Sequence, residues 1–442
     1  MEVSRSNIDR GYAWVILAAA FTLQLMAGIL VYSPGVMNIA VLEEIENDLT
    51  KTSWIGSANF GACTLLGPVA GLIQAKAGSR VAAMLGAALT LTGMTVASFC
   101  KTTFGLVLTY GLVSGFGVCL ACNVVGVVTG KYFSKRHETA FGVCIAGGGL
   151  GLFVAGPLVR YLLSQYNLSG TLLILGAIEF HMCVAGVTLR PLRKEQAQGV
   201  TESRNDQRED TATDRGYIDR LLESNVCKVF MSFRVLKHIG FLIYNVSIML
   251  WALGEAAAVF HLPYYAQQKG SSPDQAATLF TAMGVGSVFS RLAAGIMASD
   301  SKIPYLTLHT GFTGISGIVL LLFPLYSHTY TTQLVFGSLF GTYSQGMNTL
   351  VGPIVLTLVA LEEIPVAYGF AFFFQGIGYI LGPPAASWIY KLSGVYDFTY
   401  VFAGSSMVLS SMLAAAVGVV RRKDLQRMDA LTPDVQQRDV KY

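Results

Sequence analysis

The feature that most constrains this chain is a series of long apolar stretches, each near the length that crosses a bilayer as a helix. Of its 442 residues, 53% are hydrophobic and only 13% are charged, whereas a soluble globular protein carries about 25% charged residues. A helix needs roughly 20 apolar residues to span the hydrocarbon core, and only helices or closed barrels satisfy their backbone groups there. The composition therefore predicts an all-α polytopic membrane protein and gives a nucleic-acid partner no support.

Twelve such stretches are expected from the distribution of apolar residues. The first is as long as a full span, so we expect it to remain as a mature helix; a cleavable signal peptide has an apolar core of only about 7–15 residues. The expected spans are about 12–39, 52–75, 81–100, 103–129, 138–162, 170–189, 238–265, 274–298, 304–325, 331–359, 366–390 and 398–420.

Lysine and arginine in the short connections predict the orientation, because these residues collect on the cytoplasmic side. Arg10 precedes the first span, Lys76 and Arg80 lie between the second and third, and Arg421 follows the last. We therefore expect both termini in the cytoplasm.

The connection between the sixth and seventh spans divides the chain. Residues 191–216 are polar with mixed charges, a composition too poor in apolar residues to form a core. Apolar residues then recur at helical spacing over 218–233, which predicts an interfacial helix. The expected division is a six-helix half over 1–190, a central cytoplasmic loop over 191–237, a second six-helix half over 238–420, and a cytoplasmic tail over 421–442.

A glycine pattern repeats in the two halves. Ala140-Phe141-Gly142 is followed by Gly149-x-Gly151 and Gly156, and Ala367-Tyr368-Gly369 is followed by Gly376-x-Gly378 and Gly382, with one extra residue before the last glycine of the first copy. Parallel repeats of this kind occur in two-halved transporters. The repeat and the twelve expected spans together predict the major facilitator fold.

Ionisable side chains within spans are costly and mark candidate functional sites. Arg291, in the eighth span, offers a permanently charged fork that matches a carboxylate; the alternative is that it snorkels to the membrane interface. Glu255, in the seventh span, is a candidate for proton coupling or an ion-pair partner of Arg291. Glu179 and His181 are expected in a polar patch of the first bundle, and His261 at the outer mouth.

Uncharged polar residues in the spans either bind substrate or hydrogen-bond across helices, which is their commoner use. No phosphate-binding loop, metal-ligand spacing or nucleophile–base arrangement is evident, so we expect no enzyme activity, no metal and no cofactor. The polar candidates are Tyr32, Asn123, Ser287, Tyr343, Gln345, Asn348 and Gln375.

Two motifs resemble those of the monocarboxylate transporter family. Asp9-Arg10-Gly11-Tyr12-Ala13-Trp14 is similar to the family's Asp-Gly-Gly-Trp-Gly-Trp, of which Asp9, Gly11 and Trp14 are retained. The stretch from Tyr132 to Gly151 resembles the family's second motif. The residues that carry this second resemblance include Lys135, Arg136, Gly142, Gly147 and Gly151.

This resemblance implies an alternating-access carrier of small organic anions in the plasma membrane, and members of the family often pair with a single-span ancillary glycoprotein. Arg291 matches the family's arginine of the eighth span, and Asn123 matches an asparagine that faces the central cavity. Ser287 stands where lactate-carrying members have an aspartate, and the first span contains no lysine. These departures resemble members that carry aromatic amino acids, carnitine or creatine.

The sequence thus predicts a transporter of small monocarboxylates, with proton linkage left open. Its alternatives are a uniporter or exchanger of zwitterions and a transporter-like sensor or scaffold. The expected substrate-binding residues are Arg291, Tyr32, Asn123, Ser287 and Asn348, with Glu255 as the coupling candidate. The two motifs are expected to be structural.

Overall fold

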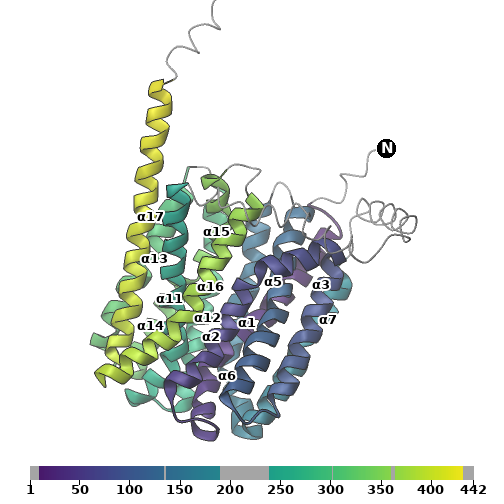
Figure 1. Cartoon of the computed structure of the whole chain (residues 1–442), viewed down its shortest axis with the longest axis vertical. Helices are drawn as coiled ribbons and strands as arrows, with labels where there is room; N and C mark the ends of the chain where they lie inside the picture. The colour runs from purple at the N-terminus through teal and green to yellow at the C-terminus, as the bar shows by residue number, and fades with distance from the viewer. Residues whose placement is uncertain (1–8, 134–135, 190–237, 301, 360–363, 432–442) are drawn as a thin grey trace, which may run out of the picture.

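The computed structural model describes residues 9–133, 136–189, 238–300, 302–359 and 364–431. Every regular element among these residues is a helix (Figure 1). The central loop, with its expected interfacial helix over 218–233, lies outside the described residues, as does the tail beyond Leu431.

The helices that precede the central loop make up the first six expected spans. They are α1 (Ala13–Glu44), α2 (Leu49–Leu65), α3 (Gly67–Ala97), α4 (Thr103–Leu106), the π-helix η2 (Val107–Ser114), α5 (Gly115–Tyr132), α6 (His137–Glu179) and α7 (Met182–Thr188).

Two of these helices each hold parts of two spans. α3 is interrupted at Gly78, whose φ is 83°, and α6 is interrupted at Asn167, whose φ is 56°. Positive φ values break the helical path of the chain, so each interruption marks a reversal between spans. The second span consists of α2 and the start of α3, and the sixth of the end of α6 and α7.

The helices that follow the central loop make up the last six expected spans. They are α11 (Ile239–Gln268), α12 (Pro273–Ala298), α13 (Tyr305–Tyr326), α14 (Tyr330–Ser344), α15 (Met347–Leu358), α16 (Ile364–Ser393) and α17 (Asp397–Leu431). The tenth span is divided into α14 and α15, and α17 continues to Leu431, past the expected end of the twelfth span at 420.

By length and composition alone, 8 helices of the described chain are able to cross a membrane. This number is smaller than twelve because His137–Thr188 counts once and contains two spans. Shorter pieces such as α2 and α14 fall below the length of a complete crossing, and α16 is not among the eight.

α6 packs closely against α1 and α12 because glycines line both contacts. A Cβ on Gly151 would lie 2.7 Å from the Cα of Gly28 in α1, and a Cβ on Gly142 would lie 3.2 Å from the Cα of Gly295 in α12. Gly147 faces the Phe21 carbonyl of α1. Small residues at such contacts let helices in a membrane approach one another.

The glycine repeat places α6 and α16 in equivalent surroundings. Gly149 faces Ser287 of α12, and its counterpart Gly376 faces Leu65 of α2. Gly151 faces α1, and its counterpart Gly378 faces α11. α6 therefore joins the first half to α12, and α16 joins the second half to α2, while in Figure 1 the first-half helices lie on the right and the second-half helices on the left.

Ion pairs join the two halves at the end of the bundle far from Tyr132. Lys391 of α16 contacts Asp48 at 3.4 Å, and Arg160 of α6 contacts Asp274 of α12 at 2.8 Å. Partial burial raises the pKa of the Asp48 carboxyl, but hydrogen bonds from the Thr50 backbone and the Lys391 ammonium outweigh it and lower the pKa overall. The Asp48–Lys391 ion pair therefore persists at pH values above the usual carboxyl pKa. It is lost only as the pH falls through the lowered pKa of Asp48.

Candidate functional site

A central cavity of about 770 Å³ lies between the two halves. Helices of both halves line it, and its polar wall includes Gln24, Tyr32, Asn123, Arg291 and Asn348. The cavity extends to the end of the bundle where α6 begins, because His137, Glu138 and Tyr305 also line it. We call this end, which carries Lys131 and Arg136, the basic end.

Arg291 lies inside the protein, with 4% of its surface exposed. Its Nη1 donates to the Ile145 carbonyl oxygen at 2.8 Å, and its Nη2 donates to the Gln345 Oε1 at 2.8 Å and to the Tyr32 hydroxyl at 3.2 Å. Its Nε has no hydrogen-bond partner among the described residues. Arg291 therefore lines the cavity while its unpaired Nε is buried, and the side chain does not snorkel to a membrane interface.

Gly148 makes room for this guanidinium. A Cβ at that position would collide with the Arg291 Nη1. Gly28, on the facing surface of α1, lies against Gly148. The contact between Gly28 and Gly148 thus brings α1 and α6 together and leaves room for a charged side chain.

Glu255 of α11 is also buried, with 2% of its surface exposed. It accepts a hydrogen bond from the Gln345 Nε2 at 2.5 Å and another from the Tyr379 hydroxyl at 3.1 Å. Among the described residues, the structure shows no ion pair between Glu255 and Arg291. The Gln345 amide lies between the two charges, with its oxygen toward the guanidinium and its nitrogen toward the carboxylate.

Gln345 is the residue whose importance the sequence did not reveal. It appears there as one of several polar candidates, yet in the structure it contacts Tyr32, Glu255 and Arg291. It lies at the break between α14 and α15, next to Gly346. A glutamine beside a glycine in an apolar span was the only available signal.

The other expected substrate-binding residues do not all reach the cavity. Asn123 and Asn348 line it, and the Asn123 side chain also donates to the Cys119 carbonyl at 3.0 Å. Ser287 is fully buried against α6, where a Cβ on Gly149 would lie 2.9 Å from its hydroxyl. The structure therefore places Ser287 in a helix contact and not in the cavity wall.

Three further ionisable residues lie away from the cavity. Glu179 is fully buried, and neither of its carboxylate oxygens has a partner among the described residues, whereas His181 is exposed. The two therefore do not share a polar patch. His261, expected at the outer mouth, is instead buried, where it contacts the Pro383 carbonyl oxygen at 3.0 Å and the Tyr396 hydroxyl.

The two sequence motifs meet at the basic end. The Asp9 backbone donates to the Tyr132 carbonyl oxygen at 3.1 Å, and the Trp14 and Phe133 rings pack edge to face. Gly11 has a φ of 56°, which suits glycine. Arg136 directly precedes α6, and Lys135 lies outside the described residues.

Aromatic rings surround the Glu255 side of the site. The Phe60 and Tyr379 ring centroids are 5.6 Å apart, and those of Tyr32 and Phe60 are 6.2 Å apart. All three residues line the cavity. Trp251 packs behind Tyr379 with a centroid separation of 6.2 Å.

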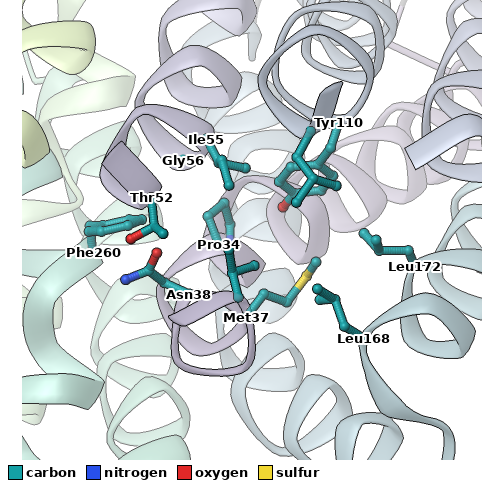
Figure 2. Close-up of a pocket in the computed structure, with 12 residues that line it drawn as sticks. Pro34, Met37, Asn38, Thr52, Ile55, Gly56, Tyr110, Leu168, Leu172 and Phe260 are labelled. Carbon is teal, nitrogen blue, oxygen red and sulfur yellow. The ribbon is translucent and has the colours of Figure 1, made fainter. Parts of the chain in front are cut away.

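Beyond the central cavity the structure is closed toward the ion-paired end. A void of about 10 Å³ lies there, large enough for about one water molecule. Figure 2 shows Asn38, Thr52 and Phe260 close together on one side of Pro34, with Tyr110 on the other. The Phe260 ring of α11 lies against Gly56 of α2. A side chain of the second half thus packs on the first half and helps to close this end of the bundle.

Comparisons with known proteins agree with this architecture. The family model described as the Major Facilitator Superfamily matches residues 16–360 and 240–431. A solved structure of the peptide transporter POT in complex with sulfate superimposes with a TM-score of 0.67 at 14% identity, covering 91% of this chain and 94% of that one. These findings confirm the predicted twelve-helix fold.

The similar curated proteins are monocarboxylate transporters. Monocarboxylate transporter 12 of Mus musculus is 26% identical over 423 residues, covering 94% of this chain and 87% of the relative. Monocarboxylate transporter 2 of Rattus norvegicus is 29% identical over 412 residues, covering 91% and 82%. The chain therefore belongs to the Major Facilitator Superfamily as a member of its monocarboxylate transporter family, and it is a membrane transporter, not an enzyme.

Proposed function

We propose that this protein carries small monocarboxylates across the plasma membrane by alternating access, with Arg291 binding the carboxylate. The environment of Arg291 is the main support for this proposal. Arg291 is buried at the cavity wall, its hydrogen bonds go to neutral groups, and its Nε is unpaired. A buried charge is costly unless it is compensated. A substrate carboxylate would give Arg291 a charged acceptor in direct contact, which none of its present hydrogen-bond partners is.

Tyr32, Asn123 and Asn348 would shape the site around this carboxylate. The Tyr32 hydroxyl already accepts a hydrogen bond from Arg291 and donates one to Gln345, so it can act as acceptor or as donor in the site. Asn123 and Asn348 lie on opposite halves of the cavity wall. Ser287, buried against Gly149, is left out of the proposed site.

Glu255 is the proposed proton carrier when the substrate is a simple anion. Arg291 and Glu255 together carry no net charge, so a bound monoanion would leave a net negative charge in a site of low dielectric. A proton on Glu255 would remove that charge. Support comes from the position of Glu255, one amide away from Arg291.

The orientation, the division of the chain and the ancillary partner are also part of the proposal. Lys131 and Arg136 favour a cytoplasmic basic end, which makes this an inward-facing form with both termini in the cytoplasm. The helices fall on either side of the central loop, which supports halves over 1–190 and 238–420, a loop over 191–237 and a tail from 421. A single-span glycoprotein partner rests on the family resemblance alone.

Uptake of labelled lactate and pyruvate into proteoliposomes tests this function. We expect Arg291→Ala to lower uptake by about tenfold or more, because a charge-assisted hydrogen bond contributes about 1.5–3 kcal/mol. Arg80→Ala, which removes an exposed arginine, is the matched control. Equal uptake by Arg291→Ala and wild type, at equal protein in the membrane, would contradict the assignment.

A pH gradient tests the coupling. We expect acidification outside to stimulate lactate uptake by wild type, and Glu255→Gln to abolish the stimulation while exchange of lactate across the membrane continues. Stimulation that survives in Glu255→Gln would exclude Glu255 as the proton carrier.

A further inference from the structure

A pair of thiols lies in the wall of the central cavity, and the proposed function uses neither of them. Cys63, near the end of α2, and Cys122, in α5, both line the cavity and are partly exposed. Their thiols are close enough to act as hydrogen-bond partners. Two helices of the first half thus present two neighbouring nucleophiles to the same open space.

Neighbouring groups hold this thiol pair in place. The Cys122 thiol also donates to the Gln24 Oε1 of α1 at 4.0 Å. A third thiol, that of Cys119, is buried one turn before Cys122, and the Asn123 amide donates to its sulfur at 3.6 Å. Among the described cysteines, only Cys63 and Cys122 line the cavity. A ligand that enters the cavity therefore meets two sulfurs.

The cavity beside the thiol pair has room for a substituent. Gly71 and Gly126 line the cavity, and a Cβ on either glycine would meet no atom within 4 Å. A Cβ on Gly67, which also lines the cavity, would lie 3.9 Å from the Cβ of Phe372 in α16. The space next to the thiols is therefore bounded by α3 and α5 on one side and by α16 of the second half on the other.

Two thiols favour a ligand that binds through two sulfurs. A structural zinc ion takes four ligands, and no group of three or more His, Cys, Asp or Glu side chains in the described part of the chain is placed to hold a metal ion. Trivalent arsenic in an organoarsenical binds two sulfurs and keeps one carbon substituent. Two sulfurs at hydrogen-bonding separation are spaced much as two sulfurs bound to one arsenic atom.

We propose that Cys63 and Cys122 form a dithiol site for trivalent organoarsenicals, and that a ligand bound there blocks transport. With phenylarsine oxide, two sulfur–arsenic bonds replace two sulfur–hydrogen bonds, and both protons leave with the arsenic-bound oxygen as one molecule of water. Arsenic stays trivalent, so the reaction needs no oxidant or reductant.

The site is accessible in this inward-facing form. The cavity extends to the basic end, and both cysteines are free thiols. In the proposed orientation this end opens to the cytoplasm, where thiols stay reduced. A ligand therefore reaches the thiol pair through the same opening as the substrate.

A phenyl group on the bound arsenic would obstruct the movement of the two halves. The thiols belong to the first half, and the rings of Tyr368 and Phe372, with centroids 6.3 Å apart, line the cavity from the second half. Alternating access requires the basic end to close when the other end opens. A rigid ring held between the halves prevents this closure. The block rests on the proposed function, whereas binding of arsenic does not.

Binding and transport are both measured on the full chain. Purified protein is treated with phenylarsine oxide, washed with a monothiol that removes arsenic attached to a single sulfur, and analysed by mass spectrometry. We expect one phenylarsenic group per wild-type chain, joining the peptides of Cys63 and Cys122 after digestion and removed by 2,3-dimercaptopropanol. Uptake of labelled lactate into proteoliposomes should be abolished by the reagent and restored by the same dithiol.

Single alanine variants locate the site. Attachment at two points exceeds attachment at one by about a hundredfold or more. The concentration of phenylarsine oxide that halves uptake should therefore rise by about a hundredfold in Cys63→Ala and in Cys122→Ala. Cys119→Ala, which removes the buried thiol beside the pair, is the matched control and should keep both the adduct and the inhibition.

The outcomes separate this site from the proposed function. If wild type retains no arsenic after the monothiol wash, or if Cys63→Ala retains as much as wild type, the dithiol site is wrong. An adduct that leaves uptake unchanged would overturn the block. If wild type carries neither lactate nor pyruvate but retains the adduct on Cys63 and Cys122, the proposed function fails and the dithiol site stands. The peptide measurement on wild type decides the location even if a variant does not fold.

Discussion

Gln345 hydrogen-bonds two buried charges at once. Without its amide, Arg291 would lose an acceptor and Glu255 a donor, and an unsatisfied charged group in a buried site is more costly than the hydrogen bond itself is favourable. The same reasoning explains why Arg291 and Glu255 are not in direct contact. A tight ion pair between them would leave Arg291 less free to bind a carboxylate.

Gln345→Glu tests this role at the scale of one residue. The new carboxylate would lie at the position that now accepts from Arg291, and it would act as a tethered competitor at high effective concentration. We expect the apparent KM for monocarboxylates to rise by about tenfold, equivalent to about 1.4 kcal/mol. The concentration dependence of lactate uptake measures this effect.

Gln375→Glu is the control, because Gln375 lines the cavity and donates to Tyr379, and among the described residues no hydrogen bond joins it to Arg291. An equal rise of KM in both variants would show that added negative charge anywhere in the cavity is sufficient, and that Gln345 has no special position.

At the scale of the element, α1 and η2 are linked through a proline. Pro34 has no backbone N–H, so the Leu30 carbonyl oxygen lacks its usual helical donor. The Ser33 hydroxyl donates to this oxygen at 2.8 Å and contacts the Tyr110 hydroxyl at 2.7 Å, and the Tyr110 hydroxyl also lies 3.3 Å from the same carbonyl oxygen. The π-helical turn that carries Tyr110 thus completes the hydrogen bonding of the interrupted helix.

Tyr110→Phe should therefore cost more stability where the proline is present than where it is not. We expect a loss of about 1 kcal/mol in wild type, and a smaller loss in a Pro34→Ala background, where residue 34 donates its own N–H to the Leu30 carbonyl oxygen and only the Ser33 contact of Tyr110 remains. Unfolding in detergent by denaturant measures both free energies. Tyr244→Phe, which removes a buried hydroxyl with no partner among the described residues, is the control. An equal loss of stability in the two backgrounds would show that the Tyr110 hydroxyl does not stabilise the protein through the Leu30 carbonyl oxygen.

At the scale of the whole molecule, the two ends of the bundle differ. The cavity extends to the basic end, while Phe260 and the two ion pairs between halves close the opposite end. Exposed ion pairs contribute only about 0–1 kcal/mol each, so this closure is weak enough to reverse during a transport cycle. Access to the site then depends on which end is closed.

Fixing the ion-paired end should stop transport without stopping binding. Asp48→Cys and Lys391→Cys, joined by a short thiol-reactive crosslinker, should abolish lactate uptake, because the closed end can no longer open. Binding of lactate to the purified protein should persist, because the cavity still extends to the basic end. Each single cysteine variant, treated in the same way, controls for the native thiols. Undiminished uptake by the crosslinked pair would show that this end does not open during transport.

The sequence by itself determined the fold. Apolar stretches of bilayer length can only be helices in a membrane, the glycine repeat marked α6 and α16, and Arg291 was recognisable because an arginine in a span is rarely without function. One extra residue between Gly151 and Gly156, relative to Gly378 and Gly382, even explains a local difference: Gly156 faces α12, whereas Gly382 faces α11, because a helix turns about 100° per residue.

Only the tertiary structure decided which polar residues meet. Asn348 and Ser287 are equally plausible as a pattern, yet the first lines the cavity and the second packs against Gly149. Lipid and the protein interior both favour apolar residues on a membrane-spanning helix. The sequence therefore does not reveal which face of the helix turns inward. Helix rotation, and the packing of one half on the other, brought Tyr32, Arg291, Gln345 and Glu255 together from four separate spans.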